Sequence, residues 1–144
     1  MHSEDDEALV AADPIPDLRC ADIPATSDRL FPLRHSLAGW IAKVGLDTDL
    51  TDAITLATDE AMSNVVSHAY PHHPGTFELH AEHRPADGVL SVTVRDRGRW
   101  RPEPADPGPL HGRGLVLIRA LAHDVVFEQE TDGTTVRMVW RLPD

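Results

Sequence analysis

The chain has 144 residues and a formal net charge of −11 at pH 7, from 24 acidic and 13 basic side chains. This length predicts a single domain with its own hydrophobic core. The acidic balance argues against direct nucleic-acid binding, which normally needs a basic surface. The apolar runs are too short for a transmembrane helix or signal peptide. The single cysteine, Cys20, excludes a disulfide framework and a cysteine-based zinc site. We therefore expect a cytoplasmic protein that does not enter the membrane.

Charge is unevenly distributed along the chain. Residues 1–17 are rich in acids and include two prolines, which predicts a flexible acidic leader before a folded domain over residues 18–144. Six of the arginines fall within residues 95–119. Such a cluster can attract a small anion, although a solvated charged face is an equally good reading of charge alone.

The first half of the folded part predicts one strand and two helices. Residues 18–24 are typical of a short edge strand that ends at a proline. Residues 30–44 carry leucine, isoleucine and valine at helical spacing. A second, longer helix begins at a cap, either Thr48 or Asp49, and runs to about Tyr70, where a proline stops it.

The second half predicts two hairpins separated by a loop and a helix. Residues 77–82 and 89–95 form the first hairpin. Residues 99–111 carry four prolines and no periodicity, a lid-like length that is often functional. A helix over residues 112–122 and a final hairpin over residues 125–142 complete the chain. This order favours a two-layer α+β sandwich over a doubly wound sheet.

Glu60 and Asn64 lie one turn apart at the edge of the apolar face of the long helix. A carboxylate and an amide at such an edge cost free energy unless they are paired or used. In the functional interpretation, Asn64 ligates a metal, for which Mg2+ with its preference for oxygen ligands is suitable, and Glu60 orients or deprotonates a hydroxyl. In the structural interpretation, both satisfy nearby backbone groups or face solvent.

Asp96 and Gly98 follow directly after a strand pattern. An aspartate at a strand end can accept a hydrogen bond from the exocyclic amine of adenine, and a glycine two residues later leaves room for the ring. An ordinary Asp-x-Gly turn has the same sequence.

Gly112 and Gly114 open the last predicted helix, where backbone amides and the positive helix end can bind an anion. A flexible junction between loop and helix is the plainer alternative. A P-loop is excluded, because Lys43 is the only lysine and no G-x4-G-K-[ST] motif is present.

Together these motifs resemble the GHKL (Bergerat-fold) ATPases. Residues 56–70 resemble the N-box, and their E-A-x-x-N-x-x-x-H-A-Y form is similar to the bacterial anti-sigma-factor serine kinases of the SpoIIAB and RsbW type. Residues 96–98 resemble the first glycine box, residues 112–115 the second, and residues 133–134 the closing Gly-Thr. The resemblance covers residues from about 20 to 142. It implies a two-layer sandwich whose mixed, mostly antiparallel sheet carries helices on one face.

The resemblance also implies roles for single residues. Asn64 would hold Mg2+ against the triphosphate of ATP, and Glu60 would be the general base toward a serine or threonine hydroxyl. Asp96 would bind the adenine amine, Gly98 would flank the ring and Thr134 would support the contact of Asp96. Residues 99–111 would form a lid over ATP. The second glycine box, implied to bind the nucleotide near its phosphates, comprises Gly112, Arg113, Gly114 and Leu115.

The function implied by the resemblance is an anti-sigma factor with serine/threonine kinase activity. It would sequester a sigma factor, phosphorylate a STAS-domain anti-sigma-factor antagonist and form a homodimer. One departure stands out, because the first glycine box commonly has a second glycine where this chain has Trp100. That bulky residue keeps open an alternative, a non-catalytic nucleotide-binding module that sequesters a partner. The ATPase domain of a sensor histidine kinase is disfavoured, since helix 30–44 is too short for a phospho-accepting helical hairpin.

Overall fold

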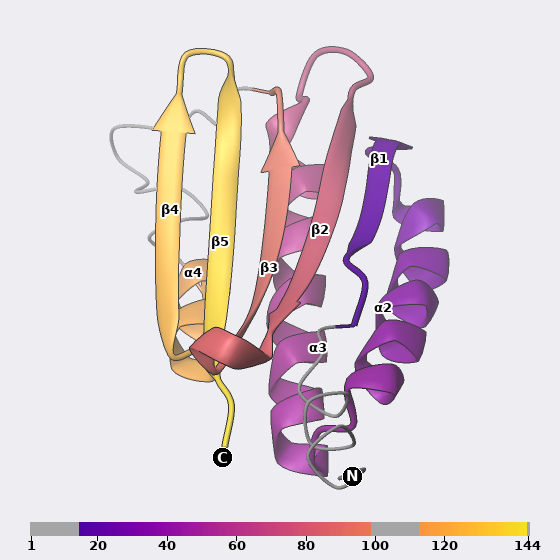
Figure 1. Cartoon of the computed structure of the whole chain (residues 1–144). Helices are drawn as coiled ribbons and strands as arrows, with labels where there is room; N and C mark the ends of the chain where they lie inside the picture. Colours follow the sequence, from indigo (N-terminus) through magenta and orange to yellow (C-terminus); the bar gives the residue numbers. More distant parts are fainter. Residues whose placement is uncertain (1–14, 99–112, 144) are drawn as a thin grey trace, which may run out of the picture.

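The computed structural model describes residues 15–98 and 113–143 (Figure 1). Its five strands form one sheet in the order β1-β2-β3-β5-β4, and every pairing between them is antiparallel. The strands are β1 (Leu18–Pro24), β2 (Thr76–Arg84), β3 (Val89–Asp96), β4 (Asp124–Glu130) and β5 (Gly133–Arg141). The predicted α+β class is confirmed. The family resemblance implied a mixed, mostly antiparallel sheet, whereas every strand pair in the described sheet is antiparallel.

Three α-helices cover one face of this sheet (Figure 1). They are α2 (Leu30–Val44), α3 (Thr48–Asn64) and α4 (Arg113–Leu121), and α3 continues into a π-helical turn, η2 (Val65–Ala69). Short 3-10 turns, η1 (Ser27–Arg29) and η3 (Pro85–Asp87), precede α2 and join β2 to β3. The predicted two-layer arrangement is therefore confirmed.

The long helix differs from its predicted form at both ends. Its N-cap is Asp47, one residue before the predicted cap, because the Asp47 side chain accepts a 2.7 Å hydrogen bond from the backbone amide of Leu50. At the other end the α-helix stops at Asn64, and the π turn η2 carries the chain on to Ala69. The sequence pattern predicted one continuous helix over both segments.

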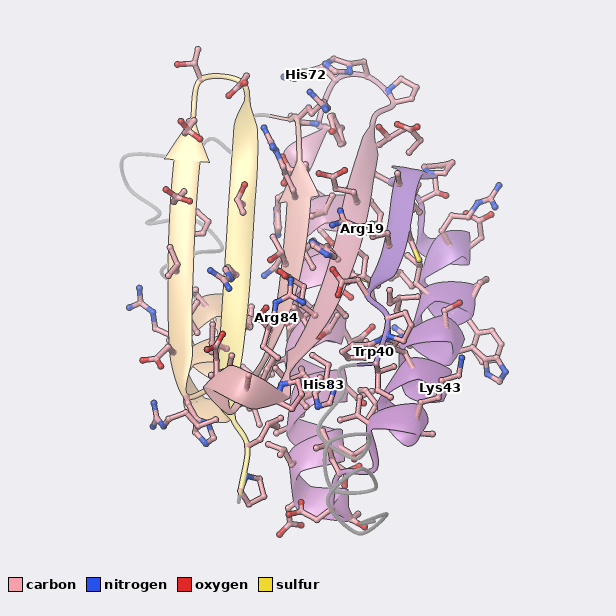
Figure 2. The ribbon with its side chains drawn as sticks, viewed as in Figure 1. Arg19, Trp40, Lys43, His72, His83 and Arg84 are labelled. Atoms are coloured by element: carbon pink, nitrogen blue, oxygen red, sulfur yellow. The ribbon has the colours of Figure 1, made fainter. Side chains whose placement is uncertain are left out.

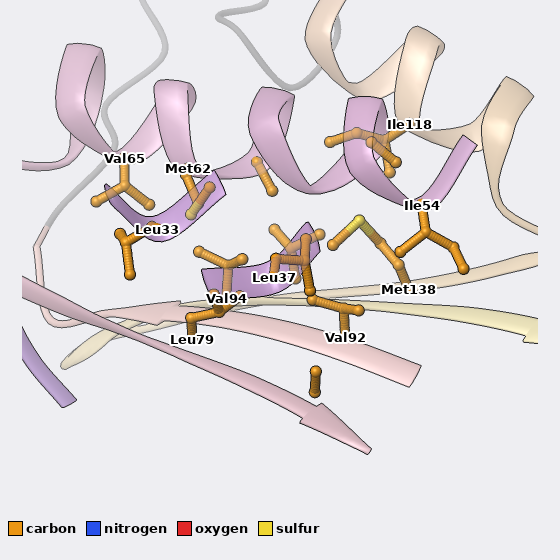
Figure 3. Close-up of a cluster of buried hydrophobic side chains, with 14 of the residues drawn as sticks. Leu33, Leu37, Ile54, Met62, Val65, Leu79, Val92, Val94, Ile118 and Met138 are labelled. Carbon is orange, nitrogen blue, oxygen red and sulfur yellow. The ribbon is translucent and has the colours of Figure 1, made fainter. Parts of the chain in front are cut away.

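The core lies between the helices and the sheet (Figure 3). Leu37, Ile54 and Met62 point from the helices toward Val92 and Met138 on the strands, and all five are almost fully buried. Both buried tryptophans also satisfy their indole N–H groups, since Trp40 donates to the carbonyl of Pro16 and Trp140 to that of Leu121. Both tryptophans therefore belong to the core.

The opposite face of the sheet carries polar side chains (Figure 2). Asp17, His80 and Glu82 lie close enough together to hold a metal ion. However, Arg84 pairs with both carboxylates, and His80 Nε2 lies 2.9 Å from Asp17 Oδ2. We interpret this group as an ion-pair network that ties the start of β1 to β2. Within the described ranges, no helix has both the length and the apolar character required to cross a membrane.

The N-terminal leader, predicted over residues 1–17, remains a prediction, because residues 1–14 lie outside the described residues. Of the remaining three, Ile15 donates its backbone amide to Nδ1 of His83, and the carbonyl of Pro16 accepts from Trp40. The chain is therefore already bonded to the domain before β1 begins.

Candidate functional site

Three of the predicted motifs, the N-box, the first glycine box and the closing Gly-Thr, meet at one end of the sandwich. The end of α3 with η2, the end of β3 and the start of β5 all lie there (Figure 1). The register of the antiparallel β3–β5 pair places Asp96 directly opposite Thr134. Both side chains face the helices, since they alternate in phase with buried Val94 and Val136.

The Asp96 carboxyl group is buried at the end of β3, with an exposed fraction of 1%. A buried carboxylate requires hydrogen-bond partners to offset its lost hydration. Its Oδ1 accepts a 2.9 Å bond from the backbone amide of Gly98, which closes a tight turn after the strand. The turn holds the carboxylate on the helix side of the sheet.

Thr134 provides the most direct sign of a ligand. Its side chain is 2% exposed, and among the described residues its Oγ1 has no hydrogen-bond partner. A buried hydroxyl without a partner costs about 1–3 kcal/mol, so native proteins seldom retain one without a use. This atom lies beside Asp96, and the pair offers a carboxylate and a hydroxyl to the same space. That donor and acceptor set fits an adenine edge.

Two glycines allow the backbones at this end to approach closely. A methyl group on Gly98 would lie 2.0 Å from the carbonyl oxygen of Ala69, and one on Gly133 would lie 2.1 Å from that of Asp96. Neither position has room for a side chain. Gly98 therefore brings the turn after β3 against the end of η2, and the first glycine box touches the N-box.

Glu60 and Asn64 lie one turn apart on α3, and both are half-buried. Neither side chain forms a hydrogen bond or ion pair with another residue in the described ranges. The neighbouring acid is engaged elsewhere, since Asp59 pairs with Arg34 of α2. Asn64 is also the last residue before η2, and single π turns are frequent at functional sites.

The phosphate end of the predicted site is only partly described. Gly112, the lid at residues 99–111 and Trp100 lie outside the described residues, so their predicted roles stay predictions. Arg113 and Gly114 form the first turn of α4. The side chain of Leu115 is buried in the core, so any contact of this residue with a nucleotide would come from its backbone.

Comparison with known proteins identifies the family. The family model described as "Histidine kinase-like ATPase domain" matches residues 23–140. The chain belongs to the histidine kinase-like ATPase family. Within this family it is similar to RsbW serine-protein kinases. It is 29% identical over 128 residues to the serine-protein kinase RsbW of Bacillus cereus (strain AH820), with 81% of this chain and 79% of the relative covered. The RsbW of Staphylococcus epidermidis is 24% identical over 131 residues, covering 81% of this chain and 82% of the relative.

Solved structures agree with this family assignment. The structure of the RsbU and RsbW domains of Rv1364c from Mycobacterium tuberculosis matches 90% of this chain, with a TM-score of 0.72 and 26% identity. This chain spans 32% of that longer protein. The blue-light activated histidine kinase EL346 of Erythrobacter litoralis matches 67% of this chain and 32% of its own length, with a TM-score of 0.57 and 26% identity. The GHKL resemblance inferred from the motifs is confirmed.

Sequence reasoning assigned no role to Tyr70, whose hydroxyl contacts the turn after Asp96. It also gave Gly133 no role beyond its place in the closing Gly-Thr motif, although this residue permits close contact with the Asp96 backbone. The tyrosine was part of the quoted N-box pattern. Its contact with β3 joins residues far apart in sequence, which no local spacing reveals.

Thr134→Val tests whether the unpartnered hydroxyl is kept for a ligand. Valine has nearly the same shape without the polar atom, so we expect the nucleotide-free protein to gain about 1 kcal/mol in unfolding free energy. We also expect ATP affinity to fall by about fivefold. Denaturant unfolding and calorimetric titration measure the two effects.

Thr58→Val is the matched control, because Thr58 Oγ1 is the other buried side-chain atom without a partner in the described part of the chain. It lies within α3 and not opposite Asp96. We expect a similar gain in stability with unchanged ATP affinity. Equal ATP binding by Thr134→Val and wild type would contradict the ligand role of Thr134.

Proposed function

We propose that the chain binds Mg-ATP and acts as a protein serine/threonine kinase of the anti-sigma-factor type. The proposal rests mainly on one observation. Buried Asp96 lies opposite Thr134 in the β3–β5 register, at the end of the sheet where the N-box helix also ends, and the Thr134 hydroxyl has no hydrogen-bond partner among the described residues. The proposal is further supported by the relatives, which are named serine-protein kinases.

In such a kinase, each of these residues would have the role that suits the chemistry of its side chain or backbone. Asp96 would accept a hydrogen bond from the adenine amine, and Thr134 would complete the base contact. The side-chain oxygen of Asn64 would ligate Mg2+. Backbone amides of the second glycine box, from Gly112 onward, would face the phosphates. When bound, Mg-ATP supplies the phosphoryl group and much of the charge neutralisation that its transfer requires.

Glu60 would act on the protein substrate. A glutamate side chain on α3, close to Asn64, can accept the proton of a serine or threonine hydroxyl as that oxygen attacks. Its lack of a partner among the described residues leaves the carboxylate available for this work. Glu60 is accordingly the proposed general base.

The partners we propose are a sigma factor, which the chain would sequester, and a STAS-domain antagonist, which it would phosphorylate. The RsbW names of the relatives support this assignment. We also propose a homodimer in the cytoplasm, with an acidic leader over residues 1–17 whose last three residues bond to the ATPase domain. These proposals rest on the family and not on a described contact.

A non-catalytic module is the second candidate, and Trp100 is the observation that favours it. Tryptophan cannot adopt the backbone conformations open to the glycine that commonly occupies this position in the family. In that case the chain would hold its partner without transferring phosphate, with nucleotide as a structural ligand.

The test is transfer of label from Mg-[γ-32P]ATP within complexes captured on the tagged protein from host lysate, beside a Glu60→Ala variant. We expect a small co-captured protein to take label with the wild type alone. Binding of ATP with no labelled protein in either sample would instead favour the non-catalytic module.

A further inference from the structure

We propose that Tyr70 is a positioning residue for the adenine contact. Its hydroxyl fixes the backbone after Asp96 and thereby holds the Asp96 carboxylate in place for the base. This inference rests on the proposed ATP binding and adds to it a residue that the family motifs leave without a role.

The Tyr70 hydroxyl uses both its hydrogen-bonding capacities at the nucleotide end of the fold. It accepts a 2.9 Å bond from the backbone amide of Arg97 and donates to the backbone carbonyl of Thr76. Arg97 lies between Asp96 and Gly98, inside the turn that the carboxylate itself closes. One side chain thus joins the exit of β3 to the start of β2.

The ring of Tyr70 has little freedom to move away from this position. A methyl group on Gly75 would lie 2.2 Å from ring atom Cε1, so the ring packs directly on the Gly75 backbone. The carbonyl of the preceding residue, Ala69, packs against Gly98 so closely that a side chain there would clash with it. The last residue of η2, Ala69, and the residue that follows it, Tyr70, therefore contact the same turn.

The hydroxyl must stay protonated to donate to Thr76. Burial raises the pKa of Tyr70 above its ordinary value of about 10, and the nearby Asp96 charge acts in the same direction. The bond that the hydroxyl accepts from the Arg97 amide and the positive charge of Arg97 oppose this shift without reversing it. The phenol is therefore neutral at physiological pH and can serve both backbone groups.

Tyr70→Phe removes only the hydroxyl, so it isolates this contact. The turn lies at the base end of the site, and we therefore expect the Kd values of ATP and ADP to rise by the same factor. That factor should be about fivefold, because the lost hydrogen bond is exposed to solvent and water can replace part of it. In the nucleotide-free protein, the Arg97 amide should exchange its hydrogen about tenfold faster.

His73→Ala is the matched control. The His73 ring lies 5.8 Å from the Tyr70 ring at a tilt of 55°, but within the described residues its hydrogen bond is to the carbonyl of Pro74 and not to the turn after β3. We expect it to leave both Kd values unchanged. Gly75→Ala is a second way to disturb the same contact, since the added methyl group must displace the Tyr70 ring from the Gly75 backbone. It should weaken ATP and ADP in parallel.

Calorimetric titration with ATP and ADP, beside amide exchange followed by NMR, distinguishes the outcomes. Wild-type affinities and wild-type Arg97 protection in Tyr70→Phe would overturn the inference. A weaker affinity for ATP with an unchanged affinity for ADP would also overturn it, because the lost contact would then be to the phosphates and not to the base. A wild type that binds neither nucleotide would overturn the proposed function itself, and this inference with it.

Discussion

Glu60→Gln is expected to lower the rate of phosphoryl transfer to a serine or threonine hydroxyl by a factor of about 10²–10⁴. The substitution keeps the shape of the side chain and removes its ability to take a proton. Asn64 and Asp96, which would hold the nucleotide, are untouched, so Mg-ATP affinity should stay within about twofold of the wild type. Single-turnover transfer and calorimetric titration measure the two quantities separately.

The matched control for Glu60→Gln is Asp59→Asn, the same chemical change one residue earlier on α3. Asp59 pairs with Arg34 on α2 and so belongs to a different face of the helix. That pair is partly exposed, so its loss should cost less than about 1 kcal/mol of stability and leave the transfer rate unchanged. Transfer by Glu60→Gln at the wild-type rate would remove Glu60 from the role of general base.

Asp96→Asn is expected to weaken ATP binding by about ten- to a hundredfold. Hydrogen bonds to charged groups contribute about 1.5–3 kcal/mol, and asparagine presents a neutral oxygen in place of the carboxylate. Guanine carries a carbonyl oxygen where adenine has its amine, and the asparagine N–H can donate to it. GTP should therefore lose less affinity than ATP does, or gain some, so the ratio of ATP affinity to GTP affinity should fall.

Calorimetric titration with ATP and GTP tests Asp96→Asn, and thermal unfolding checks that the variant folds. The side-chain oxygen of asparagine can still accept from Gly98, so the turn should survive. Asp124→Asn is the control, since Asp124 is exposed at the start of β4 and pairs with Arg141. Unchanged ATP affinity in Asp96→Asn would refute the adenine contact.

The elements of this fold could be predicted because their signals are local. Apolar spacing and a following Gly45 define α2, and alternation defines β3 and β5. Two features of α3, its N-cap and the π turn at its end, were not predicted, because the local sequence fits more than one backbone conformation almost equally well. Asp47, Thr48 and Asp49 can all cap a helix, and only the folded backbone selects the first of them. The π turn after Asn64 likewise has no distinct sequence pattern.

The site was less predictable than the fold, because its contacts join distant segments. Each motif had an ordinary structural interpretation, and only the resemblance to a known family joined them before the structure did. The sequence does not state that β5 pairs with β3, yet this pairing places Thr134 opposite Asp96. The bond of Tyr70 to Arg97 spans 27 residues and was invisible to any local pattern.

The measurement that tests the ATP site most directly is an NMR titration of 15N-labelled protein with Mg-ATP. We predict that the largest amide shifts fall on Asn64, Gly98 and Thr134, which would place the nucleotide where the motifs converge. A shallow groove of about 460 Å³ at the opposite end of the fold is the alternative location, lined among others by Leu50, Leu121 and Leu142. Shifts confined to that groove, with Gly98 and Thr134 unmoved, would contradict the proposed ATP site.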